Sequence, residues 1–129
     1  MNVQAEQRPG GRGGGRRAEA ALWASWALGP LGWALHESAS YALVTWNCGT
    51  VSYAAFHAVT VAALALAAAG GWLGWRALRR RRQAEGPEPR TGRQRFMAGV
   101  GLGICVFSFA GIVVESLPTL VLDACEGAT

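Results

Sequence analysis

Three long apolar runs that contain no basic residue limit what this chain can fold into. They cover residues 22–46, 51–75 and 96–122. About 20 apolar residues in a helix are enough to cross the roughly 30 Å hydrocarbon core of a bilayer. Lipid offers the backbone no hydrogen-bond partners, so segments of this kind are expected to be helical. The sequence therefore predicts an all-α membrane protein with three transmembrane helices.

The arginines predict the orientation of these helices. All 12 basic residues are arginine, and they lie either before residue 18 or in the connection 76–95. The segment 47–50 and the tail after residue 122 contain none. Basic residues are enriched on the cytoplasmic side of membrane proteins. We therefore expect a multi-pass protein of the bacterial inner membrane, with a cytoplasmic N-terminus and a periplasmic C-terminus. Tryptophans near the expected interfaces agree with this orientation: Trp23, Trp26, Trp72 and Trp75 inside, and Trp46 outside.

The first residues are not expected to fold alone. Residues 1–21 contain the tract PGGRGGGRR, which is too poor in apolar residues to form a core. Because the tract precedes a membrane span, we expect it to be a disordered cytoplasmic tail attracted to anionic lipid headgroups, not to nucleic acid. Residues 22–129 then form the transmembrane domain, with the arginine-rich connection 76–95 as its cytoplasmic loop.

A cleavable signal peptide is the alternative for the first run. The arginine-rich start, the apolar residues 22–35 and the small residues Ser38, Ala39 and Ser40 fit such a signal. Cleavage would remove residues 1–40 and leave two spans. Since apolar residues resume after Ser40 and continue to residue 46, we favour a retained transmembrane helix.

Two cysteines lie just beyond the predicted outer ends of the first and third runs, Cys48 and Cys125. Disulfides form and persist in the periplasm, so we expect these two cysteines to be bonded. The alternative is a pair of free thiols. Cys105 lies near the middle of the third run and is expected to act as a small apolar side chain.

Four ionisable residues lie in the predicted spans, in their outer half or near the middle: His36, Glu37, His57 and Glu115. A charge at the centre of a bilayer costs about 3 kcal/mol, so these side chains should face one another or a partner. One interpretation is a metal, haem or proton site built from His36, His57 and Glu115. The other is a set of interhelical hydrogen bonds with protonated carboxyl groups. Two histidines without regular ligand spacing do not by themselves indicate a cofactor. We therefore favour the second interpretation, with neither a metal nor another cofactor, and haem as the exception to test.

Glycines spaced four residues apart predict helix contact faces. Gly70 and Gly74 form one pair, and Gly99 and Gly103 form another. The segment GVGLG lies inside an apolar run with no preceding strand, so it is not a dinucleotide-binding loop. The chain has neither a nucleophile–base–acid set nor a CxxC motif, and we do not expect an enzyme.

Three segments carry a resemblance to a known group of proteins. They are LGPLGWALHESASYALVTWNC, the second run between His57 and the closing WR, and RF followed by ESLPTLVLDAC. Together they resemble small bacterial membrane proteins that are often encoded near haem-copper terminal oxidase and oxidase assembly genes. The resemblance implies an association with respiration. Our hypothesis is therefore an accessory or assembly protein of a respiratory terminal oxidase (cytochrome c oxidase) that acts through helix–helix contacts. A small redox or proton carrier, or an oligomeric small-solute transporter, remains an alternative.

Overall fold

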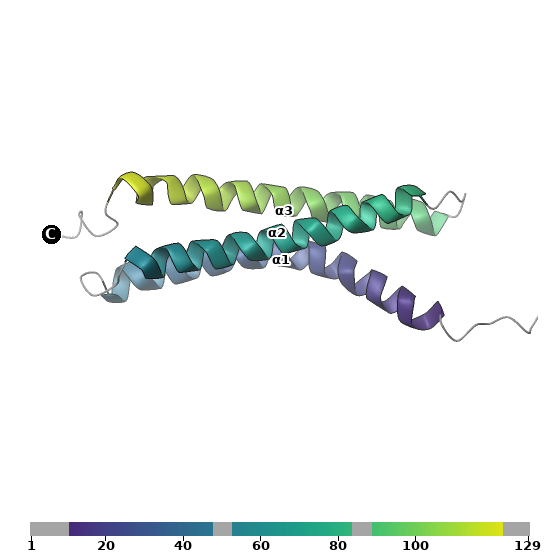
Figure 1. The fold of residues 1–129 in the computed structure, drawn as a ribbon, viewed down its shortest axis with the longest axis horizontal. Coiled ribbons are helices and arrows are strands. Elements are labelled where there is room, and N and C mark those ends of the chain that lie inside the picture. The colour runs from purple at the N-terminus through teal and green to yellow at the C-terminus, as the bar shows by residue number, and fades with distance from the viewer. Residues whose placement is uncertain (1–10, 48–52, 84–88, 123–129) are drawn as a thin grey trace, which may run out of the picture.

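The described part of the chain consists of three long helices that lie side by side. A computed structural model describes residues 11–47, 53–83 and 89–122. These residues form α1 (Gly11–Asn47), α2 (Tyr53–Gln83) and α3 (Pro89–Val121), and each helix contacts the other two. α1 and α3 run in the same direction and α2 runs in the opposite one (Figure 1). The prediction of an all-α fold is confirmed for these residues.

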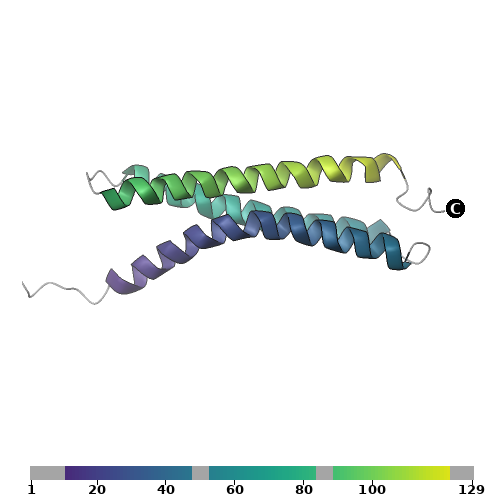
Figure 2. The ribbon, with the colours of Figure 1, turned by 180° about the vertical axis from the view of Figure 1, so that it is seen from behind.

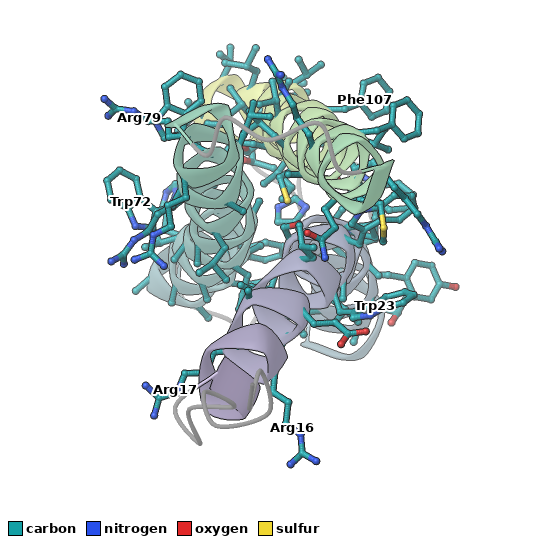
Figure 3. All side chains as sticks on the ribbon, turned by 90° about the vertical axis from the view of Figure 1, so that its right-hand side faces the viewer. Arg16, Arg17, Trp23, Trp72, Arg79 and Phe107 are labelled. Atoms are coloured by element: carbon teal, nitrogen blue, oxygen red, sulfur yellow. The ribbon has the colours of Figure 1, made fainter. Side chains whose placement is uncertain are left out.

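Two of the helices are long and apolar enough to cross a membrane. The candidate spans are Ala54–Arg80 in α2 and Gly92–Val121 in α3. Only 17% and 28% of the residues in their most apolar windows are buried, whereas a core helix of a soluble protein would be mostly buried. Trp72 and Phe107, which are 64% and 82% exposed, point away from the bundle (Figure 3). The exposed apolar surface therefore lies where lipid would cover it.

The first helix differs from the expectation in composition and in length. α1 does not reach the same hydropathy, because tryptophan, glycine, Pro30 and the pair His36 and Glu37 lower its mean. Its composition therefore does not establish a third membrane span. α1 also begins at Gly11, so residues 11–21 are helical where we expected a disordered tail. An arginine-rich sequence can continue a helix that is already held by packing further along.

The arginine-rich connection is also more helical than expected. α2 continues to Gln83 and α3 begins at Pro89. The start of α1, the end of α2 and the start of α3 lie at the same end of the bundle (Figures 1 and 2). Figure 3 looks onto this end, where the labelled side chains Arg16, Arg17 and Arg79 extend outward. The arginines of all three helices are therefore gathered at one end.

α1 is bent, and its N-terminal half diverges from the other two helices (Figures 1 and 2). Pro30 lies inside the helix, where it cannot donate a backbone hydrogen bond. The divergence leaves a cavity of about 490 Å³ between the end of α2 and the start of α1, with Arg17, Arg76 and Arg80 among its lining residues. This cavity therefore lies at the end of the bundle where the arginines gather.

Small residues bring the three helices close together near the middle of the bundle. A Cβ on Gly29 would lie 2.9 Å from the Cα of Cys105, and one on Gly70 would lie 2.8 Å from its Sγ. Cys105 is buried, and its thiol donates a hydrogen bond to the carbonyl of Ser25, 2.9 Å away. The buried apolar core consists of Ala63 and Ala67 of α2 and Ile112 of α3. The middle of the bundle is thus packed almost without large side chains.

The two predicted glycine pairs differ in their surroundings. A Cβ on Gly74 would lie 3.2 Å from the backbone nitrogen of Leu102, so the pair Gly70 and Gly74 is a contact face inside the bundle, as expected. A Cβ on Gly99 or Gly103 would meet no described atom within 4 Å. The second pair therefore makes no helix contact within the described structure.

Candidate polar site between the three helices

His36 is the buried centre of a polar cluster that joins all three helices. Its side chain is in α1, and the residue is only 6% exposed. The Nε2 atom lies 3.2 Å from Oγ1 of Thr60 in α2. The Thr60 hydroxyl donates its only hydrogen to the carbonyl of Phe56, 3.0 Å away. Thr60 therefore accepts from His36, and Nε2 carries a hydrogen.

The other ring nitrogen of His36 faces α3. Its Nδ1 atom lies 3.8 Å from Oε2 of Glu115, which is too far for a hydrogen bond. Nδ1 is buried and has no hydrogen-bond partner among the described residues. The second carboxylate oxygen of Glu115, Oε1, accepts from the indole nitrogen of Trp33 at 3.2 Å. Trp33 thus orients Glu115 so that one oxygen stays directed at the histidine.

Glu37 completes the cluster from the next position of α1. One atom each of His36, Glu37 and Glu115 lie within 4.8 Å of one another. The three side chains border a cavity of about 300 Å³, which is also lined by Ser40, Tyr41, Val44, Phe56, Thr60 and Thr119. An imidazole nitrogen and two carboxyl groups in this arrangement can share protons, accept hydrogen bonds or ligate a cation.

The fourth predicted residue, His57, is not part of this group. The structure brings together His36, Glu37 and Glu115, whereas the exposed side chain of His57 neither joins them nor lines their cavity. Successive residues of a helix point about 100° apart. Since Phe56 and Thr60 of α2 face the cavity, the intervening position 57 is turned aside. Phe56 and Thr60, which are both half-buried, are the residues of α2 that line the cavity.

The sequence interpretation missed Trp33. It lies three residues before His36 and four before Glu37, which is the spacing of neighbours on one helix face. That spacing was the available signal, but Trp33 was given no role, because only the other five tryptophans were assigned, as interfacial residues. Trp26, which was expected at the cytoplasmic interface, makes a contact within the bundle. It is only partly exposed, and its indole donates to the carbonyl of Met97 at 2.9 Å.

A larger groove lies beside the polar cluster, on the face between α1 and α3. It has a volume of about 740 Å³, and Glu115 borders both sites. Its lining is mostly apolar or small: Pro30, Trp33, Val100, Gly103, Ile104, Phe107, Ser108, Gly111 and Glu115. The outward glycine Gly103 thus lies in the groove.

The predicted disulfide falls outside the described residues, since neither Cys48 nor Cys125 is described. The described cysteine, Cys105, is free and buried. The ends of α1 and α3 that precede the two outer cysteines lie at the same end of the bundle, opposite the arginines (Figure 1). The bond stays a prediction.

No family model, curated protein or solved structure matches this chain. The geometry of the bundle is therefore the main basis for inferring a function.

Proposed function

We propose that this chain is a three-span accessory protein of the bacterial inner membrane. It binds a transmembrane helix of a partner in the groove between α1 and α3, and the partner is a respiratory terminal oxidase. The observation that supports the proposal is the groove itself, which is mostly apolar, runs along α3 and has an outward-facing glycine in its lining.

We propose α1 as the third membrane span, although its hydropathy is lower than that of α2 and α3. α1 packs against both α2 and α3, which are apolar enough to cross a bilayer. A helix that packs along two membrane-crossing helices lies in the same hydrocarbon layer as they do. The least apolar feature of α1, the pair His36 and Glu37, lies against Thr60 and Glu115 of those helices. The bundle thus supplies the polar contacts that α1 needs at that depth.

The arginine end of the bundle is proposed to face the cytoplasm. Arginines of α1, α2 and α3 gather at this end, which matches the preference of basic residues for the cytoplasmic side. Trp23 and Trp72 project outward nearer to this end of their helices, in the position of interfacial anchors (Figure 3). The polar cluster then lies in the outer part of the membrane.

The groove has the dimensions and surface of a helix-binding site. On α3 it extends from Val100 to Glu115, about 22 Å at 1.5 Å per residue, which is most of the hydrocarbon thickness. Membrane helices associate mainly by close packing over small residues, because lipid tails are as apolar as the side chains they cover. Gly103 and Gly111 permit such an approach, whereas Gly29 and Gly70 are already occupied within the bundle.

The oxidase is proposed as the partner from the sequence resemblance. The segments that carry it include parts of α1 and α3, the two helices that border the groove. The alternative carrier function, with His36, His57 and Glu115 as one site, is less well supported. It requires His57 beside the other two residues, and His57 lies outside their group.

Co-purification from the native membrane tests the proposal. The tagged chain is expressed in its native bacterium, extracted in mild detergent, and its partners are identified by mass spectrometry and haem absorbance. Gly103→Leu places a large side chain in the groove and should lower oxidase recovery at least about tenfold, a loss of roughly 1.4 kcal/mol. Ala65→Leu is the matched control, because Ala65 is exposed on α2 and does not line the groove.

The two parts of the proposal give different failures. Recovery of the oxidase at the wild-type level with Gly103→Leu contradicts the groove as the binding site. Recovery of another membrane protein, lost with Gly103→Leu but not with Ala65→Leu, keeps the groove and contradicts the oxidase as the partner.

A further inference from the structure

We propose that His36, Glu37 and Glu115 bind one divalent transition-metal ion between α1 and α3. This site is distinct from helix binding in the groove, and it does not depend on the identity of a partner. The inference rests on two independent observations: three side chains with converging donor atoms, and a buried imidazole nitrogen that has no hydrogen-bond partner among the described residues.

The buried histidine is prepared for ligation. Because the Thr60 hydroxyl donates to the carbonyl of Phe56, it can only accept from Nε2 of His36. The lone pair of the neutral ring is therefore on Nδ1, which is directed at Glu115 and makes no hydrogen bond with a described residue. Metal-bound histidines usually donate their other ring hydrogen in this way, which fixes the tautomer and the ring orientation. Thr60 is the outer partner that such a ligand requires.

Glu115 has a similar outer partner. One oxygen accepts from Trp33 at 3.2 Å, and the other lies 3.8 Å from Nδ1 of His36. Two ligands that are each about 2.1 Å from a tetrahedral ion lie roughly 3.4 Å apart. The gap between Nδ1 and Oε2 would therefore shorten by only a few tenths of an ångström on binding. One donor atom of Glu37 is also within 4.8 Å of both other ligand atoms. A side-chain rotation of Glu37, which is exposed, brings it closer without moving a helix.

Charge explains why a dication suits this location. Glu37 and Glu115 contribute a total charge of −2 when both carboxyl groups are ionised, which they must be to bind a metal ion. A divalent ion with a neutral imidazole balances this charge within the site. An unbalanced charge among apolar surroundings is unfavourable, so ligation stabilises the ionised carboxylates.

The donor set selects the class of metal. Imidazole nitrogen favours zinc, iron, nickel and copper, whereas two carboxylates broaden the set toward manganese. Magnesium and calcium prefer oxygen ligands alone and leave Nδ1 unused. Three protein ligands leave at least one coordination position for water, on the side of the cavity of about 300 Å³.

Metal binding by the purified full-length chain tests the inference. The protein carries a tag without histidine, is purified in detergent, treated with a chelator and desalted. Co²⁺ is then titrated by its visible absorbance, and Zn²⁺ by displacement of Co²⁺. We expect one equivalent of Co²⁺ per chain, displaced by Zn²⁺ and not by Mg²⁺. His36→Gln and Glu115→Gln should each weaken binding at least about tenfold.

His57→Gln is the matched control, since it removes the other histidine without touching the three ligands. It should leave the affinity unchanged within about twofold. Circular dichroism and the elution volume of each variant establish that the bundle is intact, and Glu37→Gln provides a second, exposed ligand variant. The inference is overturned if the wild-type chain binds no stoichiometric Co²⁺. It is also overturned if His57→Gln weakens binding as much as Glu115→Gln, or if neither Glu115→Gln nor Glu37→Gln weakens it.

Discussion

Individual glycines decide how closely the helices approach. Gly29 lies against the backbone of Cys105, and Gly101 lies against Ser25, where a Cβ would be 2.5 Å from the hydroxyl oxygen. The space beside these glycines is occupied by atoms of another helix. Replacing them therefore forces the helices apart, whereas a glycine on the outer face can accept a side chain.

Gly29→Ala should destabilise the bundle, because its Cβ would lie 2.9 Å from a backbone atom that cannot rotate away. Overpacking of this kind costs about 1–3 kcal/mol. Gly103→Ala is the matched control and should be neutral or stabilise by up to about 1 kcal/mol through helix propensity. The measurement is the midpoint of helix loss on adding SDS to detergent-solubilised protein. Equal midpoints for the two variants would contradict the close contact at Gly29.

The polar residues show what spacing alone could predict. His36, Glu37 and Glu115 were expected to meet because a charged side chain in an apolar helix needs a partner, and the structure brings them together. His57 was grouped with them by the same reasoning, but the rotation of α2 turns Thr60 toward the cluster instead. The azimuth of a helix is set by its packing, here over Ala63 and Ala67, and no single residue's polarity determines it.

At the scale of the elements, α3 uses two different faces. Ala98, Cys105 and Ile112 are buried in the bundle, whereas Gly103, Phe107 and Gly111 border the outward groove. The length and apolarity of α2 and α3 were predictable from the sequence, since both are properties of composition. The helical start of α1 and the shortened connection after α2 were not predictable in the same way. Packing of the neighbouring turns extends a helix into segments whose own composition is unfavourable.

The ends of α1 and α3 set the conditions for the predicted disulfide. In the sequence, Cys48 follows directly after α1 and Cys125 follows soon after α3. The described ends of these two helices lie opposite the arginines. Protein taken from cells, denatured and alkylated without reductant should carry one label, on Cys105. Reduction should raise this to three labels. Mass spectrometry of the intact chain gives the count.

The variant Cys48→Ser is the control for this measurement. Without reductant it should carry two labels, on Cys105 and on the released Cys125. Three labels on the wild-type chain without reductant would instead show that the outer cysteines are free thiols.

At the scale of the whole molecule, the arrangement of the helices connects the separate features. One end gathers the arginines, and the groove and the polar cluster lie along the remaining length. α1 and α3 run in the same direction, and His36 and Glu115 lie side by side in the bundle although they are far apart in the sequence. Helix number and the clustering of arginines follow from the sequence. The groove does not, because it depends on the bend of α1 and on which glycines face outward.

Thiol labelling of intact cells tests whether the bundle crosses the membrane three times with its arginine end inside. In a chain with Cys48→Ser and Cys125→Ser, a single cysteine is introduced as Gly13→Cys at the start of α1 or as Thr50→Cys between α1 and α2. Both of these variants also retain Cys105, which is buried. A membrane-impermeant PEG maleimide is added to spheroplasts, and the mass shift is measured on a gel before and after lysis.

We expect Thr50→Cys to be labelled in intact spheroplasts and Gly13→Cys to be labelled only after lysis. The chain with only Cys48→Ser and Cys125→Ser, which has no introduced cysteine, should stay unlabelled in both conditions. Labelling of both positions from the same side would mean that α1 does not cross the membrane. Labelling of Gly13→Cys alone in intact spheroplasts would place the arginine end outside, opposite to the proposed orientation.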